Sequence, residues 1–417
     1  MAFKGYGVAR IDGKVVFIPY SVTKDQAWVH IIEEKKDYAI GKLSQLIEPS
    51  PWRVYPPCPF FGQCGGCQWQ HIDEAIQGEF KKEILMQVLK RLGRLEQIPP
   101  IHMVSSPDPF GYRARVQLRV KEKTIGYYQE KSHHIIDIDH CPISHPLVNQ
   151  IILLLRKEIP AFSRVQEIEI NVSPEEEKGV MILHLLSFHQ GLERFIKELL
   201  LAHPILKGLA VVKKGELTFF GDPHLNFTIP LNRHRGITSL KLRTSPQSFF
   251  QVNLKQNLKL IETVIDFSEV KEDQRVLDLY AGIGNLTLPL AIGAKGAIGI
   301  EESRMAMEDA RWNAEKNGIK NCNFILGRVE EVLKHWKWES PDLVVLDPPR
   351  VGCKRVLDQV VRLEPKKIVY VSCEPTTFSR DLRLISERGY SLQKLTLIDM
   401  FPQTYHMEVV ALLKSLY

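Results

Sequence analysis

The stretch that most constrains the fold is residues 276–291, in which an apolar run enters a glycine-rich turn and a helix-like segment follows. Gly282 and Gly284 allow a sharp turn of the backbone and a close approach to a ligand, which a Cβ would prevent. A second apolar run, residues 298–300, ends in Glu301, where a carboxylate can bond a pair of ribose hydroxyls. These features predict a nucleoside-binding site at the ends of buried strands.

The same turn bears on which nucleoside cofactor would bind. The third glycine of the dinucleotide fingerprint is missing, Asn285 follows the second glycine, and Asp278 lies at the end of the first strand. Since no pyrophosphate then has to be seated on the helix N-terminus, these differences favour S-adenosylmethionine over NAD. A purely structural strand, turn and helix is the alternative.

From residue 276 onward, strands and helices alternate with little chain between them. Parallel strands with helical crossovers predict an α/β fold with a Rossmann-like, doubly wound sheet that binds ligands at the carboxyl ends of its strands. Residues 391–398 and 406–413 are close enough in sequence to form an antiparallel hairpin at the sheet edge, as in the methyltransferase variant of this fold. The other predicted strands are residues 276–279, 297–300, 323–326, 342–346 and 367–372.

Two further domains are expected, because 417 residues are many for a single domain. Residues 1–50 alternate apolar and polar positions around an Asp12-Gly13 turn, which predicts an OB-like β-barrel of the kind that often holds single-stranded nucleic acid; an ordinary β subdomain is the alternative. Residues 51–243 predict a central α/β domain, whose helix over residues 73–92 should pack on a neighbouring domain. Residues 244–417 form the catalytic domain.

Net charge and apolar content bear on the partner and the cellular location of the protein. The net charge of +6 fits a polyanionic partner but is modest. Tyr112-Arg-Ala-Arg115, together with Arg119, could contact phosphates, although a solvated charged face is the more frequent meaning of such a run. No apolar stretch is long enough to span a bilayer and the N-terminus lacks a signal core, so we expect a soluble, cytoplasmic protein, and a monomer.

Four cysteines form a candidate metal site. Cys58, Cys64 and Cys67 lie within ten residues and are separated by proline and glycine, and Cys141 is a distant fourth. Four thiolates suit tetrahedral zinc or a [4Fe–4S] cluster. Zinc ribbons prefer two separate Cys-x-x-Cys pairs, so the arrangement of three cysteines plus one favours the cluster. The Cys-x3-Cys-x2-Cys spacing of radical S-adenosylmethionine enzymes is absent.

Three residues lie where a doubly wound fold places its active site. Asp347 follows a strand and is held by two prolines, and Cys373 ends the next strand. Glu408 opens the last strand among apolar neighbours, where a carboxylate with a raised pKa could act as a general base. The alternatives are a packing role for Cys373 and a surface position for Glu408. Cys322 and Cys353 are assigned no role.

A thiolate, a carboxylate and a methyl donor together suit the methylation of an unreactive vinylic carbon such as C5 of uracil. If Cys373 adds to C6, the ring becomes an enolate whose C5 can attack the sulfonium methyl group. Glu408 then removes the C5 proton, and elimination frees the thiol. Covalent catalysis of this kind divides one difficult step into easier ones.

Over essentially its whole length the chain resembles the RNA uridine-5-methyltransferase family, in particular its iron–sulfur-containing ribosomal RNA branch. The segments that carry the resemblance are a TRAM-like opening (residues 5–49), the four cysteines, Ser248-Phe-Phe-Gln-Val-Asn253, Asp278-Leu-Tyr-Ala-Gly-Ile-Gly-Asn285, Asp347-Pro-Pro-Arg350, Ser372-Cys373-Glu-Pro and His406-Met-Glu408. The resemblance implies that Cys373 is the nucleophile and Glu408 the base, and that the four cysteines hold a [4Fe–4S] cluster. The residues that it implies for S-adenosylmethionine binding are Gln251, Tyr280, Asn285, Glu301 and Asp347. Tyr280-Ala281 departs from the Phe-Cys that members often have.

The resemblance also implies RNA as the partner, with the target base flipped out of its stack. We expect a uridine of 23S ribosomal RNA, with the T-loop uridine of transfer RNA as the alternative. Two alternatives from other functional classes are that the protein is a redox or radical iron–sulfur protein, or that it binds RNA without catalysis. The first would keep turnover after Cys373→Ala, and the second would not bind S-adenosylmethionine.

Overall fold

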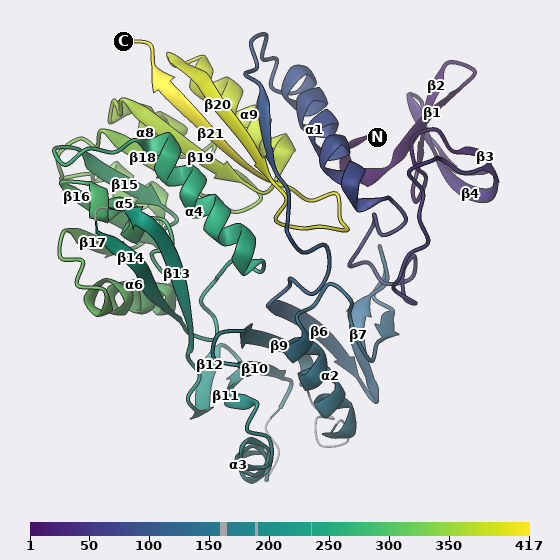
Figure 1. Ribbon diagram of the computed structural model, residues 1–417, viewed down its shortest axis with the longest axis horizontal. Helices are drawn as coiled ribbons and strands as arrows, with labels where there is room; N and C mark the ends of the chain where they lie inside the picture. Colours follow the sequence, from purple (N-terminus) through teal and green to yellow (C-terminus); the bar gives the residue numbers. More distant parts are fainter. Residues whose placement is uncertain (159–164, 188–190, 235) are drawn as a thin grey trace.

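The computed structural model of the chain describes residues 1–158, 165–187, 191–234 and 236–417. Within these residues the strands form three larger sheets and a two-stranded ribbon. Figure 1 shows an N-terminal sheet, a central sheet with α2 and α3, and a larger C-terminal sheet, with α1 lying between the N-terminal sheet and the C-terminal one. The chain therefore has one sheet formed before α1, one central sheet and one C-terminal sheet.

The N-terminal region is a four-stranded sheet in the order β1-β2-β4-β3. Its first two strands form the predicted hairpin, in which the turn residues Asp12 and Gly13 both have positive φ, 49° and 81°. Its small core contains Val16, Ile18 and Ala39. The β-rich character is confirmed, while closure into a barrel stays a prediction. The elements are η1 (Phe3–Gly5), β1 (Gly7–Ile11), β2 (Lys14–Ile18), β3 (Gln26–Glu34) and β4 (Tyr38–Glu48).

The central sheet has the order β12-β11-β10-β9-β6-β7-β8. Strand β6 alternates buried apolar and more exposed polar residues, whereas β10 and β11 carry consecutive buried apolar residues, and apolar side chains of these strands pack with α2 and α3 into one core. The ribbon β13–β14 leads from this sheet to the C-terminal domain, where Arg243 Nε lies 2.9 Å from Asp309 Oδ1 of α6. The elements are β6 (Arg115–Lys121), β7 (Thr124–Tyr128), β8 (Ile135–Asp137), α2 (Pro146–Glu158), β9 (Val165–Ser173), β10 (Lys178–Leu185), α3 (Leu192–Ala202), β11 (Leu206–Lys213), β12 (Glu216–Gly221), β13 (Leu225–His234) and β14 (Ile237–Thr244).

The C-terminal sheet has eight strands in the order β17-β16-β15-β18-β19-β21-β20-β5. The first five of these are parallel neighbours, and β20 and β21 form the predicted antiparallel hairpin. The predicted edge is wrong, because β5 from the central region pairs in parallel with β20 and covers it. The strands are β5 (Ile101–Val104), β15 (Arg275–Leu279), β16 (Gly296–Glu301), β17 (Cys322–Leu326), β18 (Leu343–Leu346), β19 (Lys367–Ser372), β20 (Tyr390–Ile398) and β21 (Glu408–Ser415).

Helices cover both faces of this sheet. One face packs against α4 (Leu254–Ser268), α5 (Thr287–Gly293) and α6 (Arg304–Lys316). The other face packs against α1 (Glu74–Arg91), α7 (Val329–Lys334), α8 (Leu357–Arg362) and α9 (Pro375–Ser386). Among the described residues, no helix combines the length and the apolar content needed to cross a membrane.

Helix α1 precedes the strands of the central sheet in sequence but packs on the C-terminal sheet. The side chain of Asp73 caps its first turn by accepting a hydrogen bond from the Ala75 N–H. Its buried apolar stripe joins the core formed by β18, β19, β20, β21 and α9. Each fully buried side chain of this kind stabilises the fold by about 1.5–3 kcal/mol, so α1 is an integral part of the catalytic domain. The stripe consists of Phe80, Ile84, Leu85, Val88 and Leu89.

Candidate active site

The turn after β15 has the backbone geometry that its glycines predict. Gly282 and Gly284 have φ values of 54° and 86°, and Tyr280 has a φ of 69°. Glu301, the last residue of β16, accepts hydrogen bonds from the N–H groups of Gly282 (2.9 Å) and Ser303 (2.7 Å). A Cβ built on Gly282 would meet no atom within 4 Å. The turn is therefore fixed by Glu301 and borders open space.

Asp278 lies beneath this turn and has an unusual environment. Its side chain is buried, and Oδ2 accepts a hydrogen bond of 2.5 Å from Thr287 Oγ1. The other oxygen, Oδ1, is buried without a hydrogen-bond partner. Burial, together with the charges of Asp347 and Glu301, raises the pKa of Asp278 to about 7. A buried oxygen without a partner is a polar group that a bound ligand can satisfy.

Two other predicted cofactor residues are linked to α4. Asn285 exchanges two hydrogen bonds of 2.9 Å with Asn257 of α4, a partner that the sequence did not reveal. Gln251 is buried in the segment that leads into α4, and Asn253 caps this helix as predicted, accepting a hydrogen bond from the Gln256 N–H. Helix α4 thus connects Asn285 on the turn with the segment that contains Gln251.

Cys373 and Glu408 lie opposite one another on neighbouring strands. In the antiparallel register of β19 and β21, Ser372 is paired with Val409, so the next residues in the register are Cys373 and Glu408. Opposite residues of an antiparallel pair have Cα atoms about 4.5–5.5 Å apart. Asp347 follows β18, which lies on the other side of β19. Three predicted site residues therefore come from three adjacent strands, next to the strand that leads into the glycine turn.

The acidic groups of this site perturb one another. Glu408 is buried, and burial together with the charge of Asp347 raises its pKa well above the usual value, while the charge of Arg350 opposes this. Asp347 as a residue is half-exposed, but desolvation of its carboxyl group raises its pKa to about 7. Perturbed carboxyl groups clustered at the carboxyl ends of strands are typical of catalytic sites.

The thiol of Cys373 is half-buried, and burial and the charge of Glu408 raise its pKa to about 12. A hydrogen bond from Arg350 and its positive charge act in the opposite direction. Cys373 also precedes the N-terminus of α9, whose first residues are capped by Glu374 and begin with Pro375. The partial positive charge at a helix N-terminus favours a thiolate. Arg350 ends the Asp347-Pro-Pro-Arg350 motif, and no local pattern in the sequence indicates its contact with the thiol.

The four predicted metal-ligating cysteines line one cavity of about 300 Å³. Cys58, Cys64 and Cys67 come from the loop before α1, and Cys141 comes from the segment before α2. The cavity is also lined by aromatic residues and by Arg350, so it adjoins the active site. Burial raises the pKa of the Cys58 and Cys64 thiols, the latter to about 11. The structure brings together the four residues that the sequence singled out.

The spacing of these sulfurs distinguishes between metals. Zinc–sulfur bonds of about 2.3 Å place the sulfurs of a tetrahedral site about 3.8 Å apart. Among the described residues, no three His, Cys, Asp or Glu side chains that include a cysteine have ligand atoms within 4.8 Å of one another. The four cysteines therefore do not have the close mutual spacing of a tetrahedral zinc site in this structure. Four thiolates are also the donor set of a [4Fe–4S] cluster.

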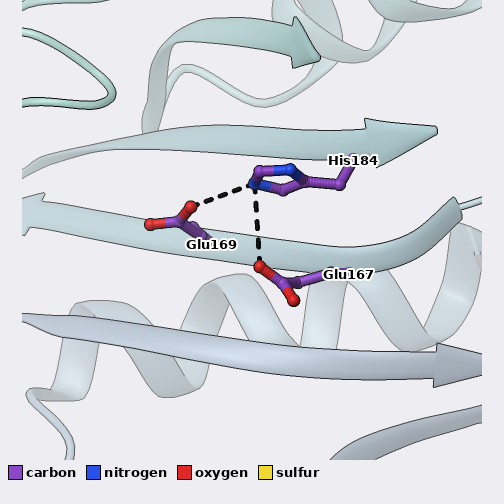
Figure 2. Close-up of side chains that lie close together, drawn as sticks. All are labelled: Glu167, Glu169 and His184. Carbon is purple, nitrogen blue, oxygen red and sulfur yellow. Dashed lines mark hydrogen bonds and ion pairs between the residues drawn. The ribbon is translucent and has the colours of Figure 1, made fainter. Parts of the chain in front are cut away.

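A second polar cluster lies on the neighbouring strands β9 and β10 of the central sheet. Glu167, Glu169 and His184 are the one group of potential metal ligands that meet within 4.8 Å in the described part of the chain (Figure 2). His184 Nε2 lies 3.0 Å from Glu169 Oε1 and 3.7 Å from Glu167 Oε1. However, Glu169 is paired with Arg115 at 2.9 Å, and Glu167 is paired with Arg119. These carboxylates neutralise two of the arginines considered for phosphate contacts, so the cluster is an ion-pair network.

Comparisons with known proteins agree with this geometry. A model of the tRNA (uracil-5-)-methyltransferase family matches residues 74–416. An uncharacterized RNA methyltransferase of Aquifex aeolicus is 33% identical over 99% of this chain and 96% of its own length. The 23S rRNA (uracil(1939)-C(5))-methyltransferase RlmD of Pectobacterium atrosepticum is 34% identical over 98% of this chain and 90% of its own length.

A solved structure is similar over the whole chain. The tRNA (uracil-54, C5)-methyltransferase of Pyrococcus abyssi, in complex with S-adenosyl-L-homocysteine, has a TM-score of 0.76 and 26% identity, covering 98% of this chain and 97% of its own. The fold and the glycine turn thus define an S-adenosylmethionine-dependent RNA methyltransferase. More narrowly, the chain belongs to the tRNA (uracil-5-)-methyltransferase family.

Proposed function

We propose that this protein methylates C5 of a uridine in RNA, with Cys373 as the nucleophile and Glu408 as the general base. The observation that carries the proposal is the placement of a half-buried thiol directly across from a buried carboxylate, next to the strand that leads into the cofactor turn. A thiol and a base on the same side of a pocket can reach C6 and C5, which are adjacent atoms of one ring. Membership of the family supports this reading.

S-adenosylmethionine would bind at the glycine turn. Open space borders Gly282, Glu301 holds the turn through the Gly282 N–H, and Asp278 has a buried oxygen without a partner, all at the strand ends. We assign Gln251, Tyr280, Asn285, Glu301 and Asp347 to this site. When bound, the cofactor supplies an electrophilic methyl group on a positively charged sulfur.

The residues of the chain act in sequence during the reaction. Arg350 and the N-terminus of α9 stabilise the thiolate of Cys373, whose sulfur forms a bond to C6 while electron density moves to C5 and the O4 of uracil. C5 takes the methyl group as the bond between that group and the cofactor sulfur breaks. Glu408, in its ionised form, then takes the proton from C5, and the C6–S bond breaks to restore the thiolate.

The raised pKa of Glu408 has two consequences for this last step. A carboxylate with a high pKa is a stronger base than an exposed one, which favours abstraction of the C5 proton. It must, however, enter the step ionised. The charge of Arg350 favours ionisation.

We further propose that Cys58, Cys64, Cys67 and Cys141 hold a [4Fe–4S] cluster. Their shared cavity of about 300 Å³ supports a common centre held by all four thiolates. The cavity is separate from the glycine turn, and the mechanism above uses no electron transfer. We therefore assign the cluster a role in structure or in RNA contact, and we retain the TRAM-like assignment of residues 1–50 as part of the same proposal.

For the substrate we propose 23S ribosomal RNA. The similarity to RlmD of Pectobacterium atrosepticum, at 34% identity over nearly the full chain, supports this choice. The similarity in fold to the Pyrococcus abyssi tRNA (uracil-54, C5)-methyltransferase supports transfer RNA as the second candidate.

The experiment that tests the function compares unmodified transcripts of 23S ribosomal RNA and of transfer RNA, each incubated with the protein and S-adenosylmethionine labelled in the methyl group. We expect labelled 5-methyluridine at one position of the ribosomal transcript. Label in transfer RNA alone would show that transfer RNA is the substrate, and the proposed methylation of uridine C5 would still hold. Failure to label either transcript, with S-adenosylmethionine bound, would contradict the proposed function.

A further inference from the structure

The loop of the β20–β21 hairpin, residues 399–407, directly precedes Glu408 and is hydrogen-bonded by several residues outside the hairpin. Each of five consecutive backbone carbonyls, from Asp399 to Gln403, accepts a hydrogen bond from a residue beyond the hairpin. The donors are Gln256 Nε2 to Asp399 O (3.0 Å), Asn253 Nδ2 to Met400 O (3.4 Å), Lys81 Nζ to Phe401 O (3.0 Å), Tyr112 Oη to Pro402 O (3.0 Å) and the Trp69 N–H to Gln403 O (3.0 Å). These hydrogen bonds tie the loop to four segments outside the hairpin.

Helix α1 contributes the strongest of these contacts. Lys81 is fully buried, and its Nζ lies 2.6 Å from Asp399 Oδ1 as well as 3.0 Å from Phe401 O. Gln77, also buried, accepts a hydrogen bond from the Gln403 N–H at 3.0 Å and donates one to Gln403 Oε1 at 3.1 Å. Burying a lysine costs free energy unless it is paired, so this position requires a specific partner. Here the partners are all in the loop before Glu408.

The loop also touches the cysteine-lined cavity. Gln68 and Trp69, which donate their N–H groups to Gln403 O at 3.2 and 3.0 Å, directly follow Cys67. On the other side, Phe401, Thr404 and His406 form part of the wall of the cavity that the four cysteines line. The loop therefore lies between the cysteine-containing segment and the proposed base.

We propose that α1 and the segment around Tyr112 position Glu408 through this loop, with Lys81 and Tyr112 as positioning residues for proton abstraction. This inference rests on the proposed role of Glu408 as the base. Glu408, the first residue of β21, is paired with Ile398 of β20, so the sheet holds Glu408 and the chain that follows it, while the loop fixes the chain that precedes it. A shift of the loop would move the carboxylate relative to C5, whereas the thiol of Cys373 and the glycine turn lie on other strands and would keep their places.

Such a shift predicts a specific kinetic result. The bond between Cys373 and C6 and the transfer of the methyl group both precede the step that needs Glu408. A displaced base therefore slows only the release of the product, and enzyme accumulates as a covalent complex with ordinary uridine RNA. A general loss of structure would instead reduce every step together, so that no complex accumulates.

The test uses two tyrosines with matching contacts. Tyr112 donates to the carbonyl of Pro402 in the loop at 3.0 Å, and Tyr390, at the far end of β20, donates to the carbonyl of Pro365 at 2.8 Å; both are buried. Replacing either by phenylalanine removes one hydroxyl and one hydrogen bond of the same kind. Lys81→Met is the stronger variant, and Glu408→Gln serves as the reference for a missing base. The RNA is whichever unmodified transcript the protein methylates, 23S ribosomal RNA or transfer RNA.

We expect Tyr112→Phe to slow turnover about fivefold, as one lost hydrogen bond would, and Lys81→Met to slow it about 100-fold, as a misplaced catalytic group would. Both should accumulate an RNA–protein complex that survives denaturation, as Glu408→Gln does, with unchanged affinity for S-adenosylmethionine. Tyr390→Phe should lose a similar amount of thermal stability without accumulating the complex.

The possible results distinguish the positioning role of the loop from the role of Glu408 as the base. If Glu408→Gln accumulates the complex but Tyr112→Phe behaves like Tyr390→Phe, the positioning role is overturned and the proposed base stands. If Glu408→Gln itself accumulates none while methylation continues, the base assignment fails and the inference fails with it. Should Lys81→Met not fold, the matched tyrosine pair decides the question.

Discussion

Cys373 and Glu408 continue the antiparallel register in which Ser372 of β19 faces Val409 of β21, so the thiol and the carboxyl group stand opposite one another. Burial and the charge of Glu408 raise the pKa of Cys373 to about 12, and burial and the charge of Asp347 raise the pKa of Glu408 well above its usual value. Cys373 and Glu408 must both be ionised to act as nucleophile and base, so positive charge near them favours the reaction. Arg350 supplies such a charge next to the thiol.

Removal of the nucleophile should abolish the reaction without affecting the cofactor site. Cys373→Ala should give no 5-methyluridine, because no other group opposite Glu408 can form the bond to C6, while its affinity for S-adenosylmethionine stays unchanged. Cys322→Ala, at a half-buried cysteine in β17, is the matched control and should keep full activity. Methylation by Cys373→Ala would favour a mechanism without covalent catalysis, such as one centred on the cluster.

Cofactor affinity should depend on pH through Asp347. Its pKa is raised to about 7, so the carboxyl group is increasingly protonated below that pH and increasingly charged above it. The positive sulfur of S-adenosylmethionine favours the charged form, so binding should release a proton, and the affinity should weaken as the pH falls below about 7, approaching tenfold per pH unit. Calorimetric titrations between pH 5 and 8 measure this.

S-adenosylhomocysteine is the matched ligand for this measurement, because its sulfur is uncharged. It should show a weaker dependence over the same pH range. Identical pH profiles for the two ligands would mean that Asp347 does not face the sulfonium.

Asp278 should lower the stability of the folded protein at neutral and higher pH. Its pKa is raised from 3.8 to about 7 on folding, so the folded state holds a proton that the unfolded state has lost between these values, and stability falls as the pH rises through this range. Asp278→Asn removes this loss and should be more stable at pH 8, by at most about 4 kcal/mol, since one pKa unit corresponds to about 1.4 kcal/mol. Chemical denaturation at pH 5 and pH 8 measures the difference.

Asp309→Asn provides the opposite control. Asp309 is also buried in the catalytic domain, but its carboxylate is paired with Arg243 at 2.9 Å and accepts hydrogen bonds from Ser245 and Ser248. Removing that charge should destabilise the protein by about 3–5 kcal/mol. A loss of stability at pH 8 in Asp278→Asn as well as in Asp309→Asn would contradict this account, because it would mean that the charged form of Asp278 is stabilised in the folded protein.

The cysteine site should contain iron and sulfide in equal amounts. Protein purified without oxygen should hold about four of each per chain, as a [4Fe–4S] cluster requires. Cys64→Ser should lose most of both, whereas Cys322→Ser should keep them. One zinc ion per chain, without sulfide, would contradict the assignment and would require the thiols to move closer together than they lie in the structure.

Much of this architecture could be predicted because it is encoded locally. The glycine turn, the caps at Asp73 and Asn253, and the alternation of the C-terminal strands each depend on neighbouring residues, and the structure has all of them. The four cysteines could be grouped because thiols at such density are rare, although their common cavity depends on chain far from the loop.

Contacts between distant segments could not be predicted. Strand β5 is a short run whose position next to β20 is decided by pairing across nearly 300 residues. Lys81 looks like any solvated helix lysine in the sequence, yet it is buried against Asp399. Tyr112 was considered as part of a phosphate-binding run, and it is instead buried with its hydroxyl on Pro402. A partner that is distant in sequence leaves no local pattern.

The most direct test of the central claim is to trap the enzyme with RNA in which 5-fluorouridine replaces uridine. Fluorine at C5 cannot be abstracted as a proton, so the reaction should stop after methyl transfer and leave the RNA bonded to the protein. We predict a complex that survives denaturation and requires S-adenosylmethionine, and peptide mapping should place the bond at Cys373. A folded protein that binds S-adenosylmethionine and methylates uridine RNA, yet forms no such complex, would contradict covalent catalysis by Cys373.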